Sequence, residues 1–120
     1  MSAKSELERM SSLWNESQRR RGQAVEIQVS AWRDPRGGMF TAAALTRIWG
    51  SDVRLGSILA SYPREKEEDA WEDLLRQYSL GRHFRSTEIW IEFDDPRTLF
   101  PPCGSADELE IRLTACGRLP

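Results

Sequence analysis

Hydrophobic residues first recur at helical spacing between residues 5 and 21. The apolar side chains on that face are Leu7, Met10, Leu13 and Trp14. The stretch Ser5-Glu6-Leu7-Glu8 has the form of a capping box, and Gly22 follows three arginines, as a glycine stop does at the end of a helix. The pattern predicts a helix over residues 5–21.

A second helical stretch runs from Pro63 to Leu80. Pro63 stands where a first helical residue would, and acidic residues crowd the opening turns, where the helix dipole favours negative charge. The apolar stripe that follows consists of Ala70, Trp71, Leu74, Leu75 and Tyr78. This spacing predicts an amphipathic helix over residues 63–80.

Alternation of apolar and polar residues marks the first predicted strand, Ala24 to Trp32. One side carries Val25, Ile27, Val29 and Ala31, and the other carries Glu26, Gln28, Ser30 and Trp32. The turn formers of residues 34–38 predict a hairpin into a second strand over residues 39–49. We expect a strand there, although the Ala-Ala-Ala-Leu run in its middle favours a helix.

Three later segments complete the pattern. Val53 to Ala60 fits either a short helix or a strand, because Gly56 weakens both. Alternation returns over Arg85–Asp94 and again over Glu108–Cys116, which predicts two further strands. The prolines between Asp94 and Ala106 predict a loop that joins them.

These elements predict one α+β domain that comprises residues 1–120. We expect an antiparallel sheet of about four strands and two main helices, in the order α-β-β-(short element)-α-β-β, because amphipathic helices need an apolar sheet face to cover. A chain of 120 residues, 39% of them hydrophobic and 30% charged, is long enough to bury a core of its own.

Net charge and targeting signals give limited information about the binding partner and the cellular compartment. The net charge is −2, so no overall field favours a nucleic acid or an anionic membrane. The sequence contains neither a membrane-spanning run nor a secretory signal, which predicts a cytoplasmic protein. In that compartment we expect Cys103 and Cys116 to be reduced, with one bridge between them as the less favoured alternative.

Few residues suggest catalysis. His83 is the one histidine, and its place just beyond the predicted helix favours an exposed histidine near a helix C-terminus over an acid–base group. The alternative is an anion-binding site formed by Arg82, His83 and Arg85. One histidine and two separated cysteines give no recognised zinc spacing, and no glycine-rich phosphate loop occurs, so we expect no metal and no cofactor.

Tryptophan is the most informative residue type, since the chain contains five. If Ile27 and Ile91 face the core, then parity places Trp32 and Trp90 on the opposite sheet face. That face would also present charged side chains: Glu26, Glu88, Glu92, Glu108, Glu110 and Arg112. Either the first helix covers these tryptophans, or they form an interface.

We therefore expect a non-catalytic module, of inhibitor, immunity or adaptor type, that binds another protein or a second copy of itself. The expected contact residues are Trp32, Trp90, Glu88, Glu92 and Arg112. The first alternative is binding of single-stranded nucleic acid, in which Arg33, Arg36 and the Arg82–Arg85 segment contact phosphates while tryptophan stacks on bases. The second is a small enzyme that uses His83 or Cys103.

Overall fold

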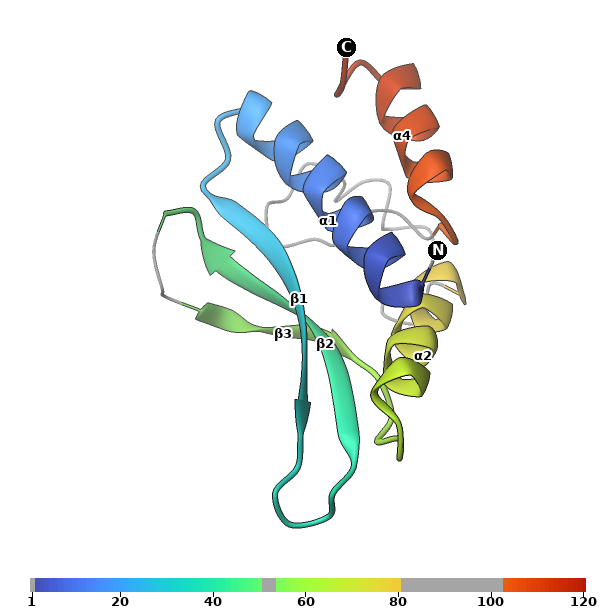
Figure 1. Ribbon diagram of the computed structural model, residues 1–120. Coiled ribbons are helices and arrows are strands. Elements are labelled where there is room, and N and C mark those ends of the chain that lie inside the picture. The colour runs from blue at the N-terminus through green and yellow to red at the C-terminus, as the bar shows by residue number, and fades with distance from the viewer. Residues whose placement is uncertain (1, 51–53, 81–102) are drawn as a thin grey trace.

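The computed structural model describes residues 2–50, 54–80 and 103–120 (Figure 1). Within these ranges the elements are, in chain order, α1 (Ala3–Arg20), β1 (Val25–Arg33), β2 (Phe40–Ile48), β3 (Arg54–Ala60), α2 (Glu67–Leu80) and α4 (Ala106–Ala115). The described part is thus a small α+β fold with three helices and a three-stranded antiparallel sheet in the order β1-β2-β3.

The first helix forms where its periodicity predicts, but its cap is different. The N-cap residue is Ser2, whose hydroxyl accepts a hydrogen bond from the N–H of Ser5 at 3.1 Å, so the helix begins earlier than the predicted capping box at Ser5. The predicted stop at Gly22 is confirmed. Its φ of +76° is a left-handed conformation that glycine adopts at little cost.

The predicted β1–β2 hairpin is also confirmed. The two strands pair in register from Val25 opposite Ile48 to Arg33 opposite Phe40. In the turn, Gly38 donates its N–H to the carbonyl of Asp34, and the Asp34 carboxylate accepts from the N–H of Arg36. The segment that fitted either a helix or a strand is strand β3, which pairs antiparallel with β2.

One face of the sheet supports the core. Ile27, Ala42 and Ala44 pack there against α1 and α2, which bring the large buried side chains Trp14, Trp71 and Tyr78. Asn15 of α1 connects the helix to β1, because its amide group exchanges two 2.8 Å hydrogen bonds with the backbone of Ile27. Helix α1 therefore lies on the Ile27 face (Figure 1) and not over Trp32.

Helix α2 begins later than predicted, at Glu67 and not at Pro63. The reason is that Arg64 exchanges two backbone hydrogen bonds with Phe40, at 2.6 and 2.9 Å, so the chain remains extended beside β2 until after this bridge. The acidic first turn then consists of Glu67, Glu68 and Asp69.

The predicted strand over residues 108–116 is wrong, because this segment belongs to helix α4. The hydroxyl of Ser105 accepts a hydrogen bond from the N–H of Glu108 and caps the helix. The sequence Ser105-Ala106-Asp107-Glu108 has the Ser-x-x-Glu form of a capping box. The buried residues Ala106, Leu109 and Leu113 follow helical spacing, whereas Ile111 of the apparent alternation is 69% exposed. The sheet of four strands in the predicted order is therefore not what the described residues form.

The predicted strand over residues 85–94 lies outside the described residues. None of the helices in the described ranges combines the length and the apolarity that crossing a lipid bilayer requires.

Candidate functional site

Only part of the predicted contact surface can be placed. Trp32 lies near the end of β1, as predicted. Arg112 does not join it on the sheet, because it belongs to α4, where it pairs with Glu108 one turn earlier at 2.8 Å. The remaining predicted residues, Glu88, Trp90 and Glu92 for a protein partner and Arg82, His83 and Arg85 for an anion, lie outside the described residues.

Trp32 is 47% exposed. It stands opposite Thr41 in the β1–β2 ladder and five positions from the buried Ile27, so alternation directs its ring to the sheet face away from the core. On the same face, Glu26 and Arg47 are cross-strand neighbours and form an ion pair. The negative charge of Glu26 is therefore already matched by Arg47.

The hairpin beyond Trp32 adds positive charge to this end of the sheet. Arg33 and Arg36 are exposed, and the guanidinium of Arg33 lies 5.9 Å from the ring centroid of Phe40. The hairpin extends beyond the end of α2 (Figure 1). A partner could therefore contact Trp32 and the two arginines without meeting the helices.

Trp49 is a second exposed tryptophan, and the sequence pattern did not predict its exposure. Trp49 follows β2, at the opposite end of the β1–β2 ladder from Trp32. Its backbone N–H donates to the carbonyl of Ala24. Trp49 is 50% exposed, and the guanidinium of Arg19 lies 4.2 Å from its ring centroid. This is cation–π geometry, so Trp49 already has an intramolecular partner.

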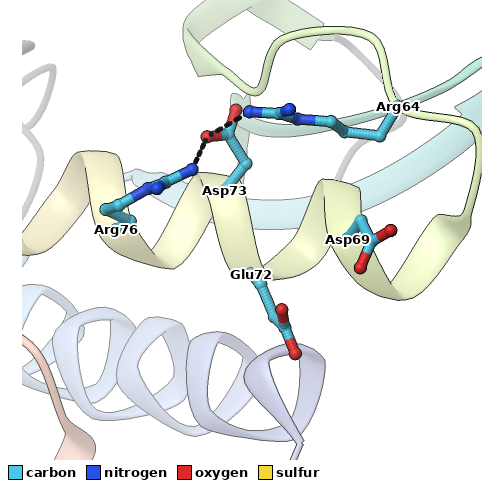
Figure 2. A pocket seen from close by; sticks show the side chains of 5 residues that line it. All are labelled: Arg64, Asp69, Glu72, Asp73 and Arg76. Carbon is cyan, nitrogen blue, oxygen red and sulfur yellow. Dashed lines mark hydrogen bonds and ion pairs between the residues drawn. The ribbon is translucent and has the colours of Figure 1, made fainter.

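A cavity of about 380 Å³ lies between α2 and the segment that precedes it. Its lining residues are Arg64, Asp69, Glu72, Asp73 and Arg76. Figure 2 shows Arg64 and Arg76 pointing toward the carboxylate of Asp73, while Asp69 and Glu72 point elsewhere. The sequence placed these acids in the opening turns of a predicted helix, where acidic side chains are usually exposed, whereas Asp73 is buried.

The Asp73 carboxylate accepts four hydrogen bonds. One oxygen receives the N–H of Tyr62 and the amide of Gln77, at 2.8 and 3.1 Å; the other receives Arg76 and Arg64, at 2.8 and 3.2 Å. Burial alone would raise the pKa of Asp73, but the bonds from Tyr62, Arg76 and Arg64 together outweigh burial and lower it. A carboxylate so stabilised is a poor proton acceptor. It instead fixes the segment before α2 to the helix.

Both cysteines are free thiols, Cys103 buried and Cys116 exposed. Burial, with a smaller contribution from Glu108, raises the pKa of Cys103 to about 12. The thiol is therefore protonated at neutral pH and a weak nucleophile, which disfavours the cysteine form of the enzyme hypothesis. Across residues 2–50, 54–80 and 103–120, no three His, Cys, Asp or Glu side chains are grouped so that they could hold a metal ion.

The described residues thus contain two contrasting features, an exposed tryptophan with arginines at the hairpin and a buried carboxylate whose hydrogen-bonding capacity is used internally. The parity of β1 was enough to find the first. The second depends on Arg64 and Tyr62, which the sequence does not relate to Asp73. Comparison of the chain with protein-family models, with curated proteins and with solved structures finds no match.

Proposed function

We propose that this protein is a non-catalytic binding module that recognises another protein through the exposed end of the β1–β2 hairpin. The observation that carries the proposal is the exposure of Trp32, nearly half of whose surface is open on the sheet face away from the core. Tryptophan and arginine are the residues that most often dominate the binding energy of protein interfaces. Trp32 with Arg33 supplies both types side by side.

The surroundings of Trp32 fit such a contact. Phe40 packs against the edge of the core, so the base of the hairpin is anchored while its tip is exposed. The Glu26–Arg47 pair leaves no unmatched buried charge at that position for a partner to desolvate. A partner would therefore gain aromatic contact area without having to compensate a buried carboxylate.

A second copy of the chain is the first partner to test. We expect the wild-type protein to self-associate, and we expect Trp32→Ala to raise the dissociation constant by about tenfold or more, the usual effect of truncating an interface tryptophan. Size-exclusion chromatography with light scattering over a concentration series measures this. Trp49→Ala is the matched control, because Trp49 is equally exposed but lies at the other end of the ladder.

A strictly monomeric wild type excludes the second copy and directs the search to a different protein. Acrylamide quenching then decides whether the surface is available at all, by comparison of the wild type with Trp32→Phe. The difference in emission between the two proteins is the contribution of Trp32. If acrylamide does not quench that contribution, Trp32 is covered in solution and the proposal is wrong.

Binding of single-stranded nucleic acid is the second candidate, favoured by the exposure of Arg33 and Arg36 next to Trp32. Acidic side chains on the same sheet face would oppose a phosphate backbone, and the sequence predicts several there. Among those in the described residues, Glu26 is paired with Arg47, while Glu108 and Glu110 belong to α4. The objection is correspondingly weaker.

For this candidate we expect a labelled oligothymidine to bind with an affinity that falls steeply as salt rises, as counterion release requires. Fluorescence anisotropy at several salt concentrations measures how the logarithm of the binding constant falls with the logarithm of the salt concentration. Arg36→Gln should make this slope shallower by the equivalent of about one phosphate contact. Undetectable binding at low salt would remove nucleic acid as a partner.

A further inference from the structure

The outer face of helix α4 points away from the core and carries exposed residues at helical spacing. These residues are Asp107, Glu110, Ile111, Thr114 and Ala115. They are also the described residues that line a surface depression of about 630 Å³, most of whose lining is apolar. Ile111 is 69% exposed, more than any other large apolar residue in the described part of the chain. This face therefore offers apolar surface to a partner.

Two carboxylates on the outer face of α4 exceed the positive charge beside them. Asp107 and Glu110 both pair with Arg9 of α1, at 2.9 and 3.1 Å. One guanidinium balances one of the two carboxylates, so the group keeps a net charge of −1. The three side chains are at least 41% exposed, and the remaining negative charge is therefore accessible to a partner.

The end of the β1–β2 hairpin has the complementary composition. Trp32 supplies exposed aromatic surface, and the exposed Arg33 and Arg36 stand against one carboxylate, that of Asp34, which leaves a net charge of +1. The Asp34 carboxylate accepts from the backbone N–H of Arg36 and not from its guanidinium. Within the described part of the chain, neither arginine forms an ion pair. Both guanidinium groups can therefore meet carboxylates of a partner.

The hairpin and α4 lie at opposite ends of the molecule (Figure 1), so a chain cannot join its own two surfaces. Two arrangements with a second copy remain. If identical hairpin ends met, positive charge would face positive charge, because a symmetric contact uses the same surface twice. If the hairpin of one copy met α4 of another, opposite net charges would face each other. The charges therefore favour the second arrangement.

We infer that the ring of Trp32 packs against Ile111 on α4 of a second copy. The hairpin arginines then lie opposite Asp107 and Glu110. This inference rests on the proposed function of the hairpin and names the surface that the hairpin recognises. Because the contact joins two different surfaces, association either closes into a ring, of which two copies form the smallest, or continues from copy to copy.

Light scattering over a concentration series tests the role of α4. We expect Ile111→Ala to raise the dissociation constant for self-association by about fivefold or more, because the contact loses apolar area. The loss reports the contact and not unfolding, since truncating so exposed a side chain scarcely changes stability. Ile48→Ala is the matched control, because Ile48 is also an exposed isoleucine but lies at the other end of the ladder from Trp32.

Mixing two variants identifies the pairing. A labelled Trp32→Ala chain keeps α4 intact, and an unlabelled Ile111→Ala chain keeps the hairpin intact, so together they restore one complete contact. By fluorescence anisotropy, we expect this mixture to associate at least about fivefold more tightly than labelled Trp32→Ala with unlabelled Trp32→Ala. A mixture that is no tighter would overturn the inference.

Failure of the inference is distinguishable from failure of the proposed function. If Trp32→Ala weakens self-association and Ile111→Ala does not, the role of α4 is wrong and the binding role of the hairpin stands. A strictly monomeric wild type also overturns the inference, and the partner of the hairpin is then a different protein. Only a Trp32 that acrylamide does not reach overturns the proposed function itself.

Discussion

Replacing Leu113 by alanine is expected to lower the free energy of unfolding by about 2–5 kcal/mol, the range for deleting a buried leucine side chain. Leu113 is completely buried on the inner face of α4, where it joins the core with Leu109. The matched variant Ile111→Ala, two residues away, should change the free energy by less than about 0.5 kcal/mol, because Ile111 is 69% exposed. Urea denaturation followed by circular dichroism measures both.

This pair of variants separates the helix from the strand that alternation suggested. In a strand, residues 111 and 113 share a face, so truncating either would cost a similar amount of stability. In α4 they face different directions. Similar losses for both variants would contradict the helix.

Replacing Asp73 by asparagine is expected to lower the free energy of unfolding by about 2–3 kcal/mol at neutral pH, because donors arranged around a carboxylate lose their charged acceptor. The expected loss of stability is no larger because the side chains of Arg64 and Arg76 are 39% and 62% exposed, so water can replace the lost carboxylate as their hydrogen-bond acceptor. Glu72→Gln is the control. It removes a carboxylate from the same helix at an exposed position, and should cost less than about 0.5 kcal/mol.

The effect of Asp73→Asn should also depend on pH in a defined direction. The pKa of Asp73 is lowered in the folded protein, so its contribution to stability is complete above the unfolded value of about 3.9 and is lost as pH falls through the folded value. The difference between wild type and variant should therefore shrink below about pH 4. A difference that stays constant down to pH 2 would show that the charge of Asp73 is not what stabilises the contact.

The hairpin and the buried carboxylate differ in what they offer a partner. Asp73 uses both oxygens within the fold, through contacts that reach Tyr62, Arg64, Arg76 and Gln77. Trp32 leaves much of its ring open to solvent. The proposed binding surface is therefore the hairpin and not the cavity at Asp73, whose carboxylate stabilises the fold.

The spacing of apolar residues alone determined the elements that show either helical spacing or strand alternation, but not both. In α1, the stripe that contains Leu7 and Trp14 has only helical spacing, and both residues are buried. In β1, alternation placed Ile27 in the core and Trp32 outside it, as observed. The exposed tryptophan of the proposed interface was thus accessible from the sequence, because side-chain direction in a strand depends only on parity.

Tertiary structure decided the segments in which two patterns competed. Residues 106–115 alternate like a strand and also repeat like a helix, and the helix gains contacts that are remote in sequence. The carboxylate of Glu6 accepts from the N–H of Ala106, 100 residues away, and Arg9 pairs with Asp107 and Glu110. The start of α2 likewise depends on the bridge between Arg64 and Phe40.

The cavity between the C-terminal ends of α1 and α4 has the same origin, since Arg118 lies near Arg20 and Arg21 only when α4 packs beside α1. Local sequence reports the spacing of apolar residues and the caps that neighbouring residues supply. It does not report which distant side chain will satisfy a helix terminus, or which charges will be brought together. Those depend on packing between segments far apart in the chain, and packing chooses between local conformations of similar free energy.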